Sequence, residues 1–89
     1  MISTLFTLYG TKGCHLCDEA EQILGQLQRV QAIKWQYIDI ALSERLVENY
    51  GLIIPVLQHS SGQELRWPFS LLDVAAFNAQ VMSLSEVER

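Results

Sequence analysis

The chain has 89 residues and a formal net charge of −4, with 49% apolar and 18% charged residues. This length favours one domain with one core, and this composition is typical of a globular protein. The six basic residues are scattered, so no basic stripe can neutralise nucleic-acid phosphates, and no apolar run approaches membrane-spanning length. We therefore expect neither a nucleic acid nor a membrane as a partner.

The first predicted element is a strand over residues 2–9, which are mostly β-branched, aromatic or aliphatic. Apolar or threonine side chains fall on both of its faces, which is typical of a central strand covered on both sides. Gly10 and Gly13 bracket the turn that follows and give it conformational freedom. Directly after this turn come both cysteines of the chain, Cys14 and Cys17, in a Cys-x-x-Cys pair.

A long amphipathic helix begins at this pair. Its apolar side chains recur at the helical spacing and predict one stripe that faces the core. The members of this stripe are Ala20, Ile23, Leu24, Leu27 and either Val30 or Gln31. Residues 33–40 predict a second strand, so that strand, helix and strand form a βαβ unit with a right-handed crossover.

A short helix is predicted over residues 44–50, with Ser43 as its N-cap and Gly51 at its end. Residues 53–57 then begin a third strand. Pro55 lies at the start of this strand, where its missing N–H removes no ladder hydrogen bond.

The Ser60-Ser61-Gly62 turn and a return strand over residues 63–67 predict a hairpin. Ser70 and Asp73 have the spacing of a capping box at the start of a last helix. The apolar side chains of this helix are predicted to be Leu72, Ala75, Ala76 and Ala79.

The predicted order is β-α-β-α-β-β-α, an α/β fold in which an antiparallel hairpin joins a parallel pair of strands. We expect one domain over residues 1–82 and a frayed C-terminal tail over residues 83–89. The first six residues have neither a basic segment nor a cleavage-like site, so we expect a cytoplasmic protein.

The position of Cys14 at the start of a helix favours thiol chemistry, because unpaired N–H groups and the positive dipole end stabilise a thiolate. Lys12 and a protonated His15 would add positive potential, whereas the acidic residues of the first turn oppose it. Cys17 lies one turn further on, within reach of Cys14, and should be less exposed. We predict that Cys14 attacks a substrate disulfide and that Cys17 resolves the mixed disulfide.

Two alternatives to redox chemistry remain open at this point. The cysteines could be small buried apolar residues, or they could anchor a metal together with His15 or His59. Zinc sites usually have two ligand clusters, and the sequence has no second cluster. A Cys-x-x-Cys pair between a strand and a helix favours the redox function, so we predict no metal site and no organic cofactor.

Several motifs together resemble the glutaredoxins. They are Leu8-Tyr9-Gly10 ahead of Cys14-His15-Leu16-Cys17, and Ile53-Ile54-Pro55-Val56-Leu57 later in the chain. The resemblance covers residues 2–82 and implies a thioredoxin fold with a four-stranded mixed sheet and three helices, in the spatial strand order second, first, third, fourth. It also implies that Pro55 is in cis and faces Cys14, and that backbone groups of Ile54 pair with an extended substrate.

The chain departs from most glutaredoxins at two places. His15-Leu16 replaces the usual Pro-Tyr, and Arg66-Trp67-Pro68-Phe69-Ser70 replaces a Gly-Gly motif that helps to hold glutathione. This Trp-Pro-Phe pattern is similar to that of small bacterial glutaredoxin-like domains. Trp67 would be a core or cover residue or part of an apolar docking surface. The helix start at Ser70 could accept a carboxylate.

The resemblance implies a thiol–disulfide oxidoreductase that reduces protein or glutathione mixed disulfides, with glutathione or a flavoprotein reductase as its reductant. Two rival functions are a binding module that keeps the fold without redox turnover and a carrier of a metal or iron–sulfur cluster. We expect a monomer. The predicted catalytic residues are Cys14 and Cys17, and the predicted substrate-binding residues are Lys12, His15, Ile54, Pro55 and Trp67.

Overall fold

The computed structural model describes residues 4–87, so the predicted strand start at residue 2 lies outside the described residues. The elements are β1 (Thr4–Gly10), α1 (His15–Gln28), β2 (Ile33–Asp39), the 3₁₀ helix η1 (Ile40–Leu42), α2 (Glu44–Tyr50), β3 (Val56–His59), β4 (Glu64–Arg66) and α3 (Leu71–Val87). The sheet order is β2-β1-β3-β4, with β1 parallel to β2 and both other pairs antiparallel. The predicted α/β architecture, four-stranded mixed sheet and strand order are confirmed.

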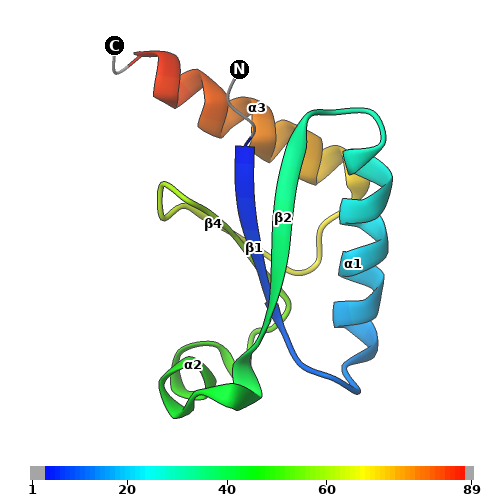
Figure 1. The fold of residues 1–89 in the computed structure, drawn as a ribbon, viewed down its shortest axis with the longest axis vertical. Coiled ribbons are helices and arrows are strands. Elements are labelled where there is room, and N and C mark those ends of the chain that lie inside the picture. Colours follow the sequence, from blue (N-terminus) through cyan, green and yellow to red (C-terminus); the bar gives the residue numbers. More distant parts are fainter. Residues whose placement is uncertain (1–3, 88–89) are drawn as a thin grey trace.

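One face of the sheet carries the core (Figure 1). Phe6 and Leu8 point to this face of β1 and are fully buried, since alternate side chains of a strand share a face. Helices α1 and α3 contact each other and contribute buried side chains to the same cluster. The members contributed by the two helices are Ala20, Leu24, Leu27, Val74, Phe77 and Val81.

The expectation that both faces of β1 are covered is wrong. Leu5, on the other face, is exposed, and Tyr9 is half-buried. The short helix α2 approaches this face, where Tyr50 stacks on Tyr9 with ring centroids 4.5 Å apart. A helix of 7 residues is too short to cover the strand along its length.

The predicted stripe of α1 is confirmed except at its end. Ala20, Leu24 and Leu27 are buried, but the helix ends at Gln28 and Val30 is 75% exposed. The backbone N–H of the C-cap residue Arg29 donates to carbonyl oxygens of the last turn. Residue 30 lies in the turn between the end of α1 and the start of β2 at Ile33, so the helical spacing does not apply to it.

The predicted stripe of α3 is wrong at Leu72, Ala76 and Ala79, which are exposed, whereas Ala75 is half-buried and packs against the core. The buried apolar side chains of the described part of this helix are Val74, Phe77 and Val81. Apolar residues occur all around this helix, so its periodicity does not identify the inner face.

Helix α3 continues past Met82 to Val87, where we expected a frayed tail. Residues 71–87 contain neither glycine nor proline, so nothing in this segment breaks the helix. The short helix α2 has its predicted cap, because Ser43 Oγ accepts a hydrogen bond from the Leu46 N–H at 3.3 Å. No helix in the described part of the chain is both long and apolar enough to cross a membrane.

Candidate active site

Cys14 is the N-cap residue of α1, as predicted. Its backbone is extended (φ −88°, ψ 108°), and its Sγ accepts a hydrogen bond from the Cys17 N–H at 3.2 Å. This position is usually filled by Ser, Thr, Asp or Asn. The half-buried sulfur therefore receives an N–H of the first helical turn, an arrangement that stabilises a thiolate.

Cys17 is the inner thiol, as predicted from its place one turn into the helix. Its exposed fraction is 0%, and both cysteines are free. Burial, together with the hydrogen bond to Cys14, raises the pKa of the Cys17 thiol to about 12, although a hydrogen bond from the Thr11 backbone opposes the shift. Cys17 is therefore a neutral thiol at physiological pH.

Gly10, the last residue of β1, lies beneath this pair. A Cβ atom at Gly10 would lie 2.7 Å from Tyr37 Oη, 2.9 Å from Cys17 Sγ and 3.1 Å from Cys17 Cβ. The Tyr37 hydroxyl and the Cys17 thiol therefore both border the space above Gly10, and only a glycine leaves room for both. Burial raises the pKa of Tyr37 to about 12, and repulsion from the ionised form of Cys17 is the next cause, so its phenol is protonated.

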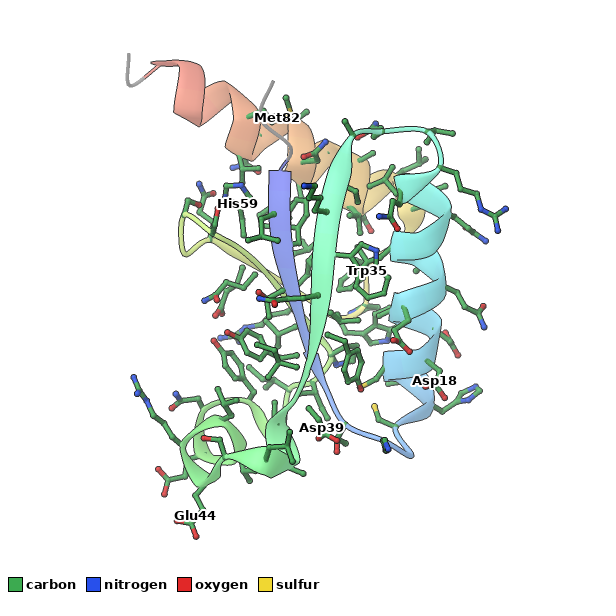
Figure 2. All side chains as sticks on the ribbon, in the orientation of Figure 1. Asp18, Trp35, Asp39, Glu44, His59 and Met82 are labelled. Atoms are coloured by element: carbon green, nitrogen blue, oxygen red, sulfur yellow. The ribbon has the colours of Figure 1, made fainter. Side chains whose placement is uncertain are left out.

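Asp39 ends β2 close to the loop that leads into α1 (Figure 2). Its Oδ1 accepts a hydrogen bond from the Ala41 N–H at 2.9 Å. This bond, then one from the Thr11 side chain, holds the pKa of Asp39 below its ordinary value, and the charge of Lys12 lowers it further. Lys12 is exposed, and its charge acts on Asp39 in the structure.

Tyr37 and Asp39 were missed in the sequence analysis, although a usable signal existed. In the parallel pair, Leu8 is in register with Tyr37, and Gly10 with Asp39. The carboxyl ends of parallel strands meet at one edge of a sheet, where sites of open α/β sheets are found. The sequence therefore allowed the prediction that the last residues of the second strand lie next to the turn that carries the cysteines.

The side chain of His15 is 85% exposed, and its Nε2 lies 3.2 Å from Glu19 Oε2, an ion pair when the imidazole is protonated. Contact of His15 with a substrate remains a prediction. In the described residues, no group of three or more His, Cys, Asp or Glu side chains is placed to hold a metal ion.

The remaining predicted substrate-binding residues lie in or after the loop before β3 and at the end of the hairpin. Ile54 is half-buried, Pro55 is buried, and the peptide bond between them is cis, as the resemblance implied. Trp67 packs edge-to-face on the buried Phe69, with ring centroids 4.9 Å apart, and lies against the core. Contacts of Ile54, Pro55 and Trp67 with a substrate remain a prediction.

The amino end of α3 is closed by its own side chains. The Ser70 N–H donates to Asp73 Oδ2 at 2.9 Å, and the Asp73 N–H donates to Ser70 Oγ at 3.1 Å. The predicted capping box is therefore confirmed. At this helix start the Asp73 carboxylate accepts the Ser70 N–H, and binding of an external carboxylate there remains a prediction.

Comparisons with known proteins agree with this geometry. Residues 5–77 match the family described as "Glutaredoxin-like domain (DUF836)". The X-ray structure of XcR50 from X. campestris is 37% identical, with a TM-score of 0.75, over 84% of this chain and 96% of that one. The solution structure of Ne2328 from Nitrosomonas europaea is 28% identical, with a TM-score of 0.74, over 86% and 93%. No curated protein matches the chain.

The β-α-β-α-β-β-α order, the β2-β1-β3-β4 sheet and a cysteine pair at the start of α1 define a thioredoxin-like fold of the glutaredoxin type. The chain belongs to the glutaredoxin-like DUF836 family, whose model matches it over most of its length.

Proposed function

We propose that the protein is a dithiol–disulfide oxidoreductase that reduces mixed disulfides of proteins or of glutathione. The observation that carries this proposal is the unequal pair of thiols at the start of α1. Cys14 is half-buried and receives the Cys17 N–H, whereas Cys17 is fully buried. Such a pair has an accessible nucleophile and a protected second thiol within one helical turn.

The reaction takes two exchanges. The Cys14 thiolate attacks one sulfur of a substrate disulfide, forms a mixed disulfide and releases the other half of the substrate as a thiolate. Cys17 then attacks Cys14 Sγ, which forms the Cys14–Cys17 disulfide and releases the second half. The substrate gains two electrons, the cysteine pair loses two, and the proton of Cys17 passes to solvent or to the departing thiolate.

The reductant that restores the dithiol is glutathione or a flavoprotein reductase. The capping box occupies two backbone N–H groups at the start of α3, those of Ser70 and Asp73, and so leaves fewer donors there for a glutathione carboxylate. A Cys-x-x-Cys pair as the only two cysteines suits the cytosol, where such a pair is typically catalytic and not a structural disulfide. We place the reaction in that compartment, with the protein as a monomer.

The test is capture of the mixed disulfide. The Cys17→Ser variant, incubated with a glutathionylated peptide, should accumulate a covalent adduct at Cys14 that dithiothreitol reverses. The Cys14→Ser variant is the matched control and should form none. If Cys17→Ser captures nothing while the wild-type dithiol is reduced and folded, the protein acts as a binding module and the proposal is wrong.

Glutathione-dependent turnover separates the two reductants. Wild-type protein that reduces the peptide with glutathione, and loses this activity on Cys14→Ser substitution, uses glutathione. Turnover with a thioredoxin reductase and NADPH, but none with glutathione, identifies the flavoprotein route.

A further inference from the structure

The buried position of Cys17 raises a question about the second exchange. Cys17 must take on negative charge as it attacks Cys14, yet its side chain is shielded from water. Charge that develops out of water needs hydrogen-bond donors that are already in place. The Thr11 backbone supplies one hydrogen bond to this sulfur.

A second donor lies on the neighbouring strand. Tyr37 Oη and Cys17 Sγ lie within 3 Å of the same point, the position that a Cβ atom of Gly10 would occupy. The parallel pairing of β1 with β2 fixes this arrangement, because Leu8 and Tyr37 are in register two residues before Gly10 and Asp39. A neutral phenol carries one proton that it can donate, and a thiolate is a stronger acceptor than a thiol.

We propose that the Tyr37 hydroxyl is a hydrogen-bond donor to Cys17 Sγ as this sulfur becomes negatively charged in the resolving step. The inference rests on the proposed function and names the group that assists its second exchange. The hydroxyl keeps its proton throughout. The new bond joins the sulfurs of Cys14 and Cys17, the bond between Cys14 and the substrate breaks, and the thiol proton of Cys17 leaves with the solvent or the substrate thiolate.

The charges that face Tyr37 keep its phenol in the donating form. The titratable groups are Cys17 and Glu21 on α1, the N-cap residue Cys14, and Asp39 on its own strand. All of them are negative when ionised and oppose a phenolate. Lys12, on the turn after β1, acts on Asp39. Tyr37 therefore remains protonated over the pH range in which disulfide exchange is measured.

The two exchanges can be followed separately with 5,5′-dithiobis(2-nitrobenzoate). The Cys14 attack releases one coloured thiolate, and the Cys17 attack on the mixed disulfide releases a second. Tyr37→Phe should slow the second release about ten- to hundredfold, the value of one hydrogen bond to a charged group, and leave the first unchanged. It should also move the midpoint of the pH profile of the second release upward.

Tyr9→Phe is the matched control, because Tyr9 lies on β1 but donates its hydroxyl to Gln58 Oε1 at 3.1 Å. It should leave both releases unchanged. If Tyr37→Phe gives the wild-type rate and pH midpoint for the second release, the inference is wrong, and Tyr37 only packs beneath the thiol.

If Tyr37→Phe does not fold, a second variant tests the role of the Tyr37 hydroxyl. The chain has three tyrosines, so 3-fluorotyrosine incorporated into a Tyr9→Phe/Tyr50→Phe variant alters Tyr37 alone. The more acidic phenol should speed the second release, and an unchanged rate would contradict the inference. Failure of the proposed function is distinct, because wild-type protein would then release no second thiolate.

Discussion

The helices α1 and α3 both begin with a side chain that accepts a backbone N–H, but the two ends differ in what is left accessible. At α3, Ser70 and Asp73 satisfy each other in a reciprocal capping box. At α1, the acceptor is the sulfur of Cys14, which is half-buried and free. The positive end of one helix is thus neutralised by its own carboxylate, and that of the other supports a reactive group.

This difference shows that the amino end of a helix can either be closed by its own side chains or hold a reactive group. In the capping box, the Asp73 carboxylate and the Ser70 hydroxyl each accept one backbone N–H, so two donors of the helix start are already paired. A thiol cap gives one weaker bond and keeps a nucleophile at the positive end of the dipole. On the opposite face of the sheet, the Tyr50 hydroxyl donates to Glu64 Oε2 at 2.7 Å. This hydrogen bond links α2 to the hairpin and has a structural role.

The largest expected effect is a difference in reactivity between the two thiols of α1. With a pKa of about 12, Cys17 is a thiolate in roughly one molecule in ten thousand at pH 8. Iodoacetamide at pH 8 should therefore modify native protein once, at Cys14, as seen by mass spectrometry. Labelling of Cys17 should rise as the pH approaches 12, because the thiolate fraction rises.

Protein in 8 M urea serves as the control for this labelling experiment, and both cysteines should react there. Two adducts formed at similar rates on the native protein at pH 8 would contradict the buried, protonated state of Cys17.

The next effect concerns the space beneath the start of α1. Gly10→Ala would place a Cβ within 3 Å of Tyr37 Oη and Cys17 Sγ, so we expect a loss of about 1–3 kcal/mol in the free energy of unfolding. Urea denaturation of the reduced protein measures this loss. Gly25→Ala in the same helix meets no atom within 4 Å and should instead stabilise by about 0.5–1 kcal/mol. Equal results for the two substitutions would refute the close packing at Gly10.

At the closed end, Ser70→Ala removes the oxygen that accepts the Asp73 N–H. The free energy of unfolding should fall by about 1 kcal/mol, as for other N-cap substitutions. Ser60→Ala in the exposed hairpin turn should change it by less than about 0.5 kcal/mol. If Ser70→Ala unfolds at the same urea concentration as the wild type, the capping box does not contribute to the stability of the protein.

The smallest effect is expected at Cys14 itself. Serine is a good N-cap, so Cys14→Ser should keep the hydrogen bond from the Cys17 N–H and change stability by less than about 0.5 kcal/mol. Cys14→Ala lacks an acceptor and should lose about 1 kcal/mol in the same measurement. If both variants unfold at the same urea concentration, Cys14 does not act as a cap.

Most of the fold could be predicted from the sequence because its signals are local. Ser43 and the Ser70–Asp73 pair identify helix starts within a few residues of chain, and both are confirmed. The inner face of α3 could not be predicted, because apolar residues such as Leu72 surround this helix and only its neighbours determine which side is buried. The exposure of one face of β1 could not be predicted either, because it depends on how much of the strand the short helix α2 covers in the folded structure.

The sequence by itself determined the chemistry of the site: a Cys-x-x-Cys pair between a strand and a helix places one thiol at the amino end of that helix and the other a turn inside. Only the tertiary structure decided what surrounds the inner thiol. Tyr37 and Cys17 both approach Gly10, because parallel pairing brings the end of β2 beside this residue and its missing side chain leaves room for both. This arrangement joins segments that are distant in the chain, so it depends on the register of the sheet and on no local pattern.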